Sequence, residues 1–374
     1  MRKTSRVAIV RAHSYEPADV EAAVARGLKL IGPLSAVLAG KKRLLLKPNL
    51  LHGDPPERCS ATHPAVLGAV GKILQQEGYT VVYGDSPAVQ RPRTAAQKAG
   101  YEAVAAEFGM TLADFERGEE RTVPGGRQNR VFYIARGVVE AEAVINLPKM
   151  KTHGLTGMTG ALKNMFGVIP GIRKAGFHAR LGDAASFSRM IVDLNRMVTP
   201  TLSIMDAIQG MEGNGPRNGR PVHTGLLLFS QDPVALDATA SRIMGLDPAE
   251  LYLLRYAAES GLGMIAEDKI EILSLSLREA RGKPYRLHPP GTRTFGTSGW
   301  QSLLKRVLIP KPVIDPRRCS RCGQCERICP VSPKALVREQ KDAVPEYAYD
   351  RCIRCYCCQE ICPEAVSYTH LTLP

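Results

Sequence analysis

Short apolar segments alternate with longer amphipathic segments through most of the chain. The short segments are rich in leucine or β-branched residues and predict strands at residues 6–12, 43–49, 80–86, 111–115, 131–135, 143–149, 202–207, 225–230 and 270–274. The longer segments repeat apolar residues at helical spacing and predict helices at residues 18–31, 64–78, 187–198 and 233–245. Near-continuous apolar strands that alternate with helices are typical of an α/β fold. We therefore expect a mostly parallel sheet with helices on both faces.

Polar residues follow the ends of several predicted strands. These residues are Lys47, Asn49, Asp85, Ser86, Asn146, Lys149, Asp206, Gln231 and Asp232. Ligands of open α/β sheets bind beyond the carboxyl ends of the strands, so the set as a whole favours a ligand site there. Asp85 and Asp206 are its candidates for proton transfer or for metal binding. For a single residue the alternative is capping of the following helix, as for Asp232 before the segment PVALD.

The segment INLPKMKTHGLTGMTGALKNMFG, residues 145–167, holds the densest group of candidates. If its strand continues past Pro148, the side chains of Lys149, Lys151 and His153 share one face. Lys163 then follows on a glycine-flanked helix. Three cations and a histidine near a helix start suit an anionic group such as a carboxylate or a phosphate. The alternative is a mobile loop that carries solvated lysines.

Two histidines and one turn are weaker candidates. Thr62 is expected to cap the helix that follows it, and His63 is then either a proton-transfer group or a surface residue. His178 lies in RKAGFHARLGD, a basic stretch that we expect to be flexible and able to close over an anion. The segment MEGNGPRNGRP, residues 211–221, predicts a turn that could be a lid, an anion nest or a tight connection.

Composition limits the partners. The 374 residues carry a formal net charge of +14, but the basic residues are spread along the chain without an aromatic-studded basic stripe. We therefore expect no nucleic-acid partner, and a small anionic substrate or a redox partner protein instead. No stretch approaches the roughly 18 unbroken apolar residues that span a bilayer. The basic start is followed only by VAIV, which predicts a strand rather than a signal peptide, so we expect a cytoplasmic protein.

Nine of the ten cysteines lie after residue 318, and only Cys59 precedes them. The spacing C-x2-C-x2-C-x3-C occurs twice there, each time followed by a proline, and this is the signature of bacterial ferredoxins with two 4Fe-4S clusters. In that arrangement the fourth cysteine of each set ligates the other cluster, which predicts two clusters. The first is held by Cys319, Cys322, Cys325 and Cys362, and the second by Cys352, Cys355, Cys358 and Cys329.

Cys357 lies outside both repeats, and we interpret it as a packed or exposed thiol. A zinc site is the alternative for the region, but zinc needs only four ligands and does not require the double repeat.

These features divide the chain into four segments. Residues 1–285 are expected to form the α/β domain, and residues 286–314 a linker with a short helix at 300–308. Residues 315–365 are expected to form a small α+β dicluster ferredoxin-like domain. The tail VSYTHLTLP, residues 366–374, matches one reading frame of a sequencing adapter, and we interpret it as an artefact.

A family resemblance rests on several motifs that occur in order. They are KPNLL, ATHPAVLGAV, VYGDSPA, VINLPKMKTHGLTGMTGALKNMFGVIPG, DAIQGMEGNGPRNGRP and SQDPVALDATASRIMG. Over residues 7–265 the chain resembles the domain of unknown function 362 family, whose members often carry a fused dicluster ferredoxin module. The resemblance implies an α/β fold and an iron–sulfur protein, and it names no reaction.

Three functions remain open at this point. The leading hypothesis is an iron–sulfur oxidoreductase in which two clusters pass electrons to or from an anionic ligand at the carboxyl edge of the sheet. The second is a non-catalytic electron-transfer partner that docks another oxidoreductase. The third is a ligand-binding or maturation factor whose clusters are structural.

Overall fold

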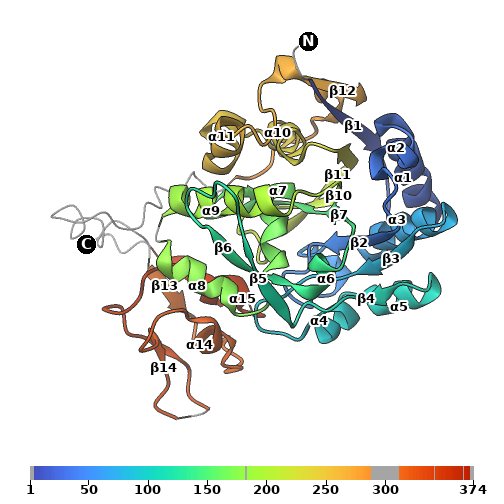
Figure 1. Ribbon diagram of the computed structural model, residues 1–374. Helices are drawn as coiled ribbons and strands as arrows, with labels where there is room; N and C mark the ends of the chain where they lie inside the picture. Colours follow the sequence, from blue (N-terminus) through green and yellow to red (C-terminus); the bar gives the residue numbers. More distant parts are fainter. Residues whose placement is uncertain (1–3, 182, 288–310, 341, 365, 371–374) are drawn as a thin grey trace.

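A ten-stranded sheet forms the centre of the protein (Figure 1). The computed structural model describes residues 4–181, 183–287, 311–340, 342–364 and 366–370. Eight strands lie in the order β12 (Ile270–Ser274), β1 (Ser5–Arg11), β11 (Arg220–Ser230), β10 (Leu202–Glu212), β7 (Ala143–Leu147), β2 (Arg43–Pro48), β3 (Thr80–Tyr83) and β4 (Thr111–Leu112). Outside this order, β8 (Lys149–His153) pairs with β10 and with β9 (Gly157–Thr159). Most neighbouring pairs are parallel, as expected.

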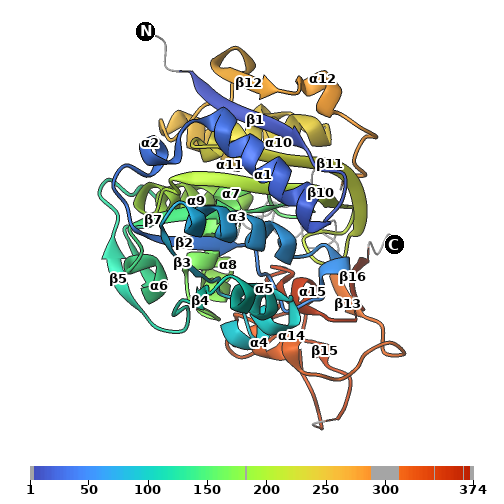
Figure 2. The ribbon, with the colours of Figure 1, turned by 90° about the vertical axis from the view of Figure 1, so that its right-hand side faces the viewer.

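Helices cover both faces of this sheet, which confirms the predicted fold class (Figure 2). One face packs against α1 (Pro17–Ile31), α2 (Leu34–Leu38), α3 (Pro64–Gln76), α4 (Pro92–Lys98) and α5 (Tyr101–Glu107). The other packs against α7 (Ala161–Asn164), α8 (Arg173–Arg180), α9 (Ala184–Met197), α10 (Pro233–Met244), α11 (Tyr252–Glu259) and α12 (Leu277–Ala280). Along β1, Val7 and Ile9 face one helical layer while Ala8 and Val10 face the other. The continuous apolar runs of the strands follow from this burial on two sides.

Strand β11 runs antiparallel to both of its neighbours, β1 and β10. Its carboxyl end therefore lies at the opposite edge of the sheet from the ends of the parallel strands. Gln231 and Asp232 follow β11, so their predicted place in the ligand site is wrong. Asp232 instead caps α10 by accepting hydrogen bonds from the backbone N–H groups of Val234 and Ala235, as its alternative interpretation predicted.

Two other predictions are corrected locally. The predicted strand 131–135 is β6 (Val131–Ala135), but it pairs with β5 (Gly118–Thr122) outside the main sheet, next to α6 (Arg136–Val139). His63, rather than Thr62, caps α3, because its Nδ1 accepts a hydrogen bond from the N–H of Ala65. The Thr62 hydroxyl is used elsewhere, donating to the carbonyl of Leu147.

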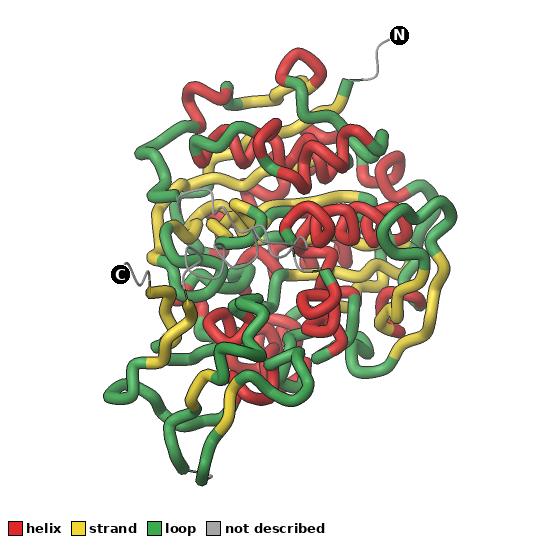
Figure 3. The backbone as a smooth tube through the Cα atoms, turned by 90° about the vertical axis from the view of Figure 1, so that its left-hand side faces the viewer, coloured by secondary structure: helices red, strands yellow, loops and turns green. Residues whose placement is uncertain are grey.

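The C-terminal module is built mainly of loops and lies against one end of the α/β domain (Figure 3). Its elements are β13 (Lys311–Ile314), α14 (Gln324–Ile328), β14 (Leu336–Val337), β15 (Glu346–Tyr347), α15 (Cys357–Ile361) and β16 (Ser367–His370). β13 pairs with β16, so part of the predicted linker is a strand, whereas the predicted helix at 300–308 lies outside the described residues. The adapter origin of residues 366–374 stays a prediction. Within the described residues, no helix has the length and apolar character needed to cross a membrane.

Candidate functional site between the two modules

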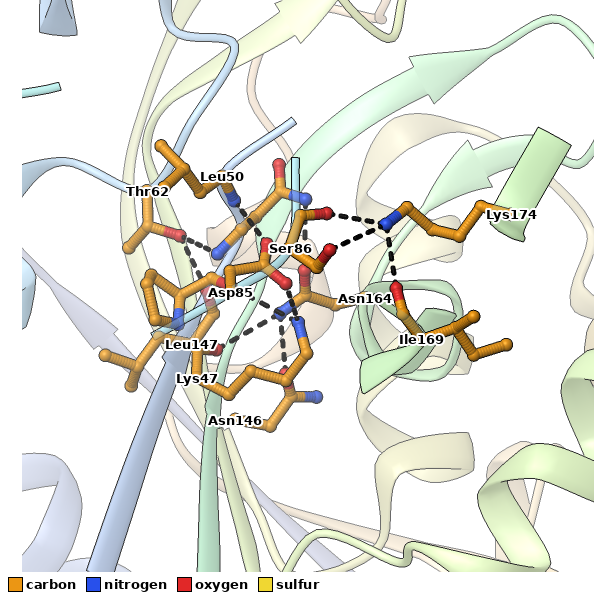
Figure 4. Close-up of polar contacts among 12 residues, drawn as sticks. Lys47, Leu50, Thr62, Asp85, Ser86, Asn146, Leu147, Asn164, Ile169 and Lys174 are labelled. Atoms are coloured by element: carbon orange, nitrogen blue, oxygen red, sulfur yellow. Dashed lines mark hydrogen bonds and ion pairs between the residues drawn. The ribbon is translucent and has the colours of Figure 1, made fainter. Parts of the chain in front are cut away.

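A buried ion pair lies at the carboxyl edge of the central strands (Figure 4). The ammonium of Lys47, from β2, lies 2.8 Å from the carboxylate of Asp85, which follows β3. The other carboxylate oxygen of Asp85 accepts a hydrogen bond of 2.7 Å from the N–H of Leu50. Burial lowers the pKa of Lys47, and the charge of Asp85 opposes that shift. Asp85 is thus occupied in holding a buried cation.

Asparagine side chains join this ion pair to α7. Asn164 donates to the side chain of Asn146 at 2.7 Å and to the carbonyl of Lys47 at 3.2 Å. Asn49 donates to Asn164 at 3.0 Å. The ends of β2 and β7 are therefore tied to the helix that carries Lys163.

A second buried ion pair involves Lys149 and Asp206, which are paired in register on β8 and β10 at 2.8 Å. The hydroxyl of Tyr15 donates to Asp206 at 2.8 Å and accepts from Lys149 at 2.7 Å. The ring of Tyr15 stacks on His63, with the centroids 3.6 Å apart. Burial lowers the pKa of His63 to about 4, so this ring is neutral at pH 7.

The strand does not continue unbroken past Pro148, because β7 ends at Leu147 and a separate strand, β8, begins at Lys149. β8 nevertheless places Lys149, Lys151 and His153 together. Each is only 1% exposed, so the solvated-lysine alternative is wrong for this strand. Lys151 donates to Asn49 at 2.7 Å and to a backbone carbonyl at 2.6 Å. Burial, and then the charges of Lys163 and Lys149, lower the pKa of Lys151 to about 7.

His153 links β8 to the C-terminal module. Its Nδ1 accepts a hydrogen bond of 3.0 Å from the N–H of Leu155, so a neutral ring carries its proton on Nε2. Nε2 lies 3.5 Å from the carboxylate of Glu360 on α15.

A buried arginine takes part in the contact between the modules. Arg217 lies in the connection between β10 and β11, where its guanidinium contacts both carboxylate oxygens of Asp54, at 2.6 and 2.8 Å. The same guanidinium donates to the carbonyl of Ile361 at the end of α15. Asn218 adds a hydrogen bond of 3.0 Å to the carbonyl of Gln359. Residues 213–219 are thus a connection that holds the C-terminal module.

The cysteines gather within that module. All four cysteines predicted for the first cluster, together with Cys358, line one cavity. Of the second predicted set, Cys329 and Cys358 are buried in one apolar cluster, against which Cys352 and Cys355 pack. The hydroxyl of Tyr347 lies 3.1 Å from the Cys358 sulfur. Thiols that surround a volume suit a cube of irons, because each thiolate binds a different iron.

No three His, Cys, Asp or Glu side chains of the described residues are grouped so that they could hold a single metal ion. Burial raises the pKa of Cys325 to about 12, so this thiol is protonated unless a metal displaces the proton. Cys357 is buried at the start of α15, which favours the packed rather than the exposed thiol.

A cavity of about 80 Å³ lies between the two modules. Its polar lining comes from Lys163, Lys174 and His178 of the α/β domain and from Cys357 and Glu360 of α15. Of the four residues predicted to bind an anion, Lys163 lines this cavity, whereas Lys149, Lys151 and His153 do not.

Two further findings concern α8 at this cavity. The stretch around His178 is a helix rather than a flexible segment. Lys174 was missed from the sequence, although it lies in the same basic stretch. It donates three hydrogen bonds to oxygens of Ser86 and Ile169 (Figure 4).

Comparisons with known proteins match two parts of the chain. A family model described as "Domain of unknown function (DUF362)" matches residues 44–242, and one described as "4Fe-4S dicluster domain" matches residues 311–363. The chain is 36% identical over 259 residues to Thylakoid-associated protein sll1697 of Synechocystis sp., a match that covers 69% of this chain and 79% of that protein.

Two solved structures are weakly similar. The lactate racemase apoprotein from Thermoanaerobacterium thermosaccharolyticum matches with a TM-score of 0.42 and 13% identity, over 66% of this chain and 58% of that one. A protein from Thermotoga maritima matches with a TM-score of 0.35 and 10% identity, over 67% of this chain and 60% of that one. The chain spans less than two thirds of either structure.

Proposed function

Because the chain belongs to the domain of unknown function 362 family and carries a 4Fe-4S dicluster domain, we propose that it is a redox protein with two clusters. Electrons pass between these clusters and a small anionic ligand held at the carboxyl edge of the α/β sheet. One observation carries this proposal. The cysteine-rich module lies directly against the lysine-rich edge, through the contacts of Arg217 with Ile361 and of His153 with Glu360.

The proposed cluster ligands follow the crossed arrangement. Cys319, Cys322, Cys325 and Cys362 hold the first cluster, and Cys352, Cys355, Cys358 and Cys329 hold the second. When bound, the clusters supply one-electron chemistry at a potential set by the surroundings of their sulfurs. A reducing compartment such as the cytoplasm keeps these thiols available as ligands.

The α/β domain supplies positive charge and excludes water. Lys163 is the proposed anion ligand because it lines the cavity. Lys149, Lys151 and His153 are buried on β8 and do not line the cavity, so we assign them a supporting role at this edge of the sheet. Asp85 and Asp206 each accept from a buried lysine, so we assign them a positioning role. In that role they hold the lysines and transfer no proton.

The test is an anaerobic preparation of the full chain with iron and sulfide counting and electron paramagnetic resonance of the reduced protein. Two clusters require about eight iron atoms per chain. Cys325→Ser should lower the iron content and remove one spectral signal, whereas the control Cys357→Ser should keep both. Protein without iron, or equal iron in wild type and Cys325→Ser, would refute the assignment.

An electron carrier that docks a second oxidoreductase is the other candidate, and a specific surface favours it. Cys322 is exposed, and the nearby Arg317, Arg318 and Arg321 are exposed as well. Such a surface suits an acidic redox protein. Electron transfer to an acidic carrier that slows with salt, in protein that binds no small anion, would favour this candidate over the first.

A further inference from the structure

We propose that the cavity between α7, α8 and α15 binds a small carboxylate, with Lys163 as its cationic anchor and His178 as a second polar contact. This inference rests on the proposed function, since it names the ligand class and location of the same redox site. It also places the ligand beside cysteines that are proposed to hold the clusters.

Lys163 is partly buried and differs from the four buried lysines described above. Lys47, Lys149, Lys151 and Lys174 each donate to protein oxygens. The ammonium of Lys163 has no hydrogen bond or ion pair to any described residue, although it lines the cavity and burial lowers its pKa. The Lys163 ammonium is partly shielded from water, and the charge of Glu360 favours its ionised form without making an ion pair with it. An anion that enters the cavity would therefore gain a charge-assisted contact.

His178 gives the cavity a second polar group. Its ring stacks on Phe187, with the centroids 4.6 Å apart, and meets the edge of Phe166. It makes no hydrogen bond with any other described residue. Burial lowers its pKa to about 3, so the ring is neutral at pH 7 and offers one donor and one acceptor. A carboxylate can accept from that donor while it also contacts Lys163.

The rest of the lining limits the size and shape of the ligand. Leu51, Phe166, Ile328 and Ile361 supply an apolar wall. A cavity of about 80 Å³ holds on the order of five water-sized groups, which is enough for a small carboxylate. A carboxylate with a short aliphatic part matches both the cationic wall and the apolar wall.

The charges that face the cavity favour an anion. Lys163 and Lys174 bring two positive charges, and Glu360 brings one negative charge. The Glu360 carboxylate lies 3.5 Å from His153 Nε2, on the side of β8. With all three groups ionised, the sum is one positive charge.

The cavity also adjoins the proposed second cluster. Two of its lining residues, Ile328 and Cys357, immediately precede Cys329 and Cys358 in the sequence. Both of those cysteines are proposed ligands of the second cluster. Ile361, which also lines the cavity, immediately precedes Cys362, a proposed ligand of the first cluster. A bound carboxylate would therefore lie near cysteines of both proposed clusters.

The test uses the full chain with its clusters reconstituted under anaerobic conditions, and its iron content is measured first. The probes are acetate, propionate and butyrate, with acetamide, propionamide and butyramide as uncharged partners of the same shape. Affinity is measured by calorimetry, and the spectrum of the reduced clusters by electron paramagnetic resonance. We expect the carboxylates, but not the amides, to bind and to alter one cluster signal.

Lys163→Met should weaken binding by about tenfold or more, because it removes a charge-assisted hydrogen bond. The matched control Lys29→Met changes an exposed lysine on the other helical layer and should bind like wild type. His178→Phe keeps the stacking on Phe187 and should weaken carboxylate binding severalfold. This second variant tests the inference if Lys163→Met does not fold.

The outcomes separate the two proposals. Protein that contains both clusters but binds no carboxylate, or whose Lys163→Met and His178→Phe variants bind like wild type, overturns this inference and leaves the clusters in place. Protein that takes up no iron overturns the proposed function.

Discussion

Arg217 offers the sharpest test of how the two modules are joined. Its guanidinium is 5% exposed and contacts both oxygens of Asp54, Nδ1 of His52 at 3.0 Å and the carbonyl of Ile361. Burial alone would raise the pKa of Asp54, but hydrogen bonds from His52 and Arg217 hold that pKa below its ordinary value. Asp54 therefore stays ionised in the interior because of its hydrogen bonds to His52, Arg217 and Ser60.

Arg217→Met removes the cation and keeps much of the side-chain volume. Breaking a buried ion pair by removing one partner costs about 3–5 kcal/mol, since the remaining charge is left without compensation. We expect the free energy of unfolding to fall by about that amount in a urea titration. Arg217→Met combined with Asp54→Asn should recover part of the loss, because no buried charge then remains.

The same variant should loosen the C-terminal module locally. The carbonyl of Ile361 loses its donor, so amide hydrogen exchange over residues 357–363 should become faster, while exchange in β1 should change little. The reasoning is refuted if Arg217→Met has the urea midpoint of wild type and the same exchange over residues 357–363.

Three further predictions concern the carboxyl edge and the cavity. Asp85→Asn leaves the Lys47 ammonium buried without its anion and should cost about 3–5 kcal/mol in a urea titration, whereas a catalytic role alone would leave stability unchanged. Burial lowers the pKa of Lys174 from 10.5 to about 7, so between these values the unfolded chain binds a proton that the folded chain does not. In urea titrations above pH 7, the free energy of unfolding of wild type should therefore rise relative to that of Lys174→Met by up to about 1.4 kcal/mol per pH unit. A difference between the two proteins that stays constant with pH would contradict this. Gly167→Ala places a methyl group against the Asp85 carboxylate and should cost about 1–3 kcal/mol by thermal or urea unfolding, while Gly176→Ala, which meets open space, should not destabilise.

The sequence pattern predicts the elements of the sheet well, because strands buried on two sides need continuous apolar runs. It also predicts that Lys149, Lys151 and His153 share a strand, since their spacing follows the period of two. It does not predict the direction of β11, because an apolar run has the same composition in either direction. The misplacement of Gln231 and Asp232 follows from that one ambiguity.

The sequence predicts only part of the site between the modules, because much of that site depends on contacts between residues that are far apart in the chain. Lys163 was found because it lies in a dense cationic segment. Arg217 and Glu360 were missed because their importance depends on contacts between residues that are far apart in the sequence, such as Arg217 with Ile361. The composition of residues 211–221 predicts a turn, but nothing in it indicates which of the side chains is buried.

The C-terminal module covers the lysine-rich edge, and this contact limits what can be learned from the two modules as separate fragments. A chain shortened to the α/β domain would open the wall of the cavity formed by α15, hydrate Lys163 and Lys174, and relieve the burial that lowers their pKa values. An excised module would in turn lose the guanidinium of Arg217 from the end of α15. In each fragment these residues would therefore have a different hydration, ionisation or hydrogen bonding than in the intact chain. Experiments on the fragments would not reproduce the behaviour of the intact polypeptide.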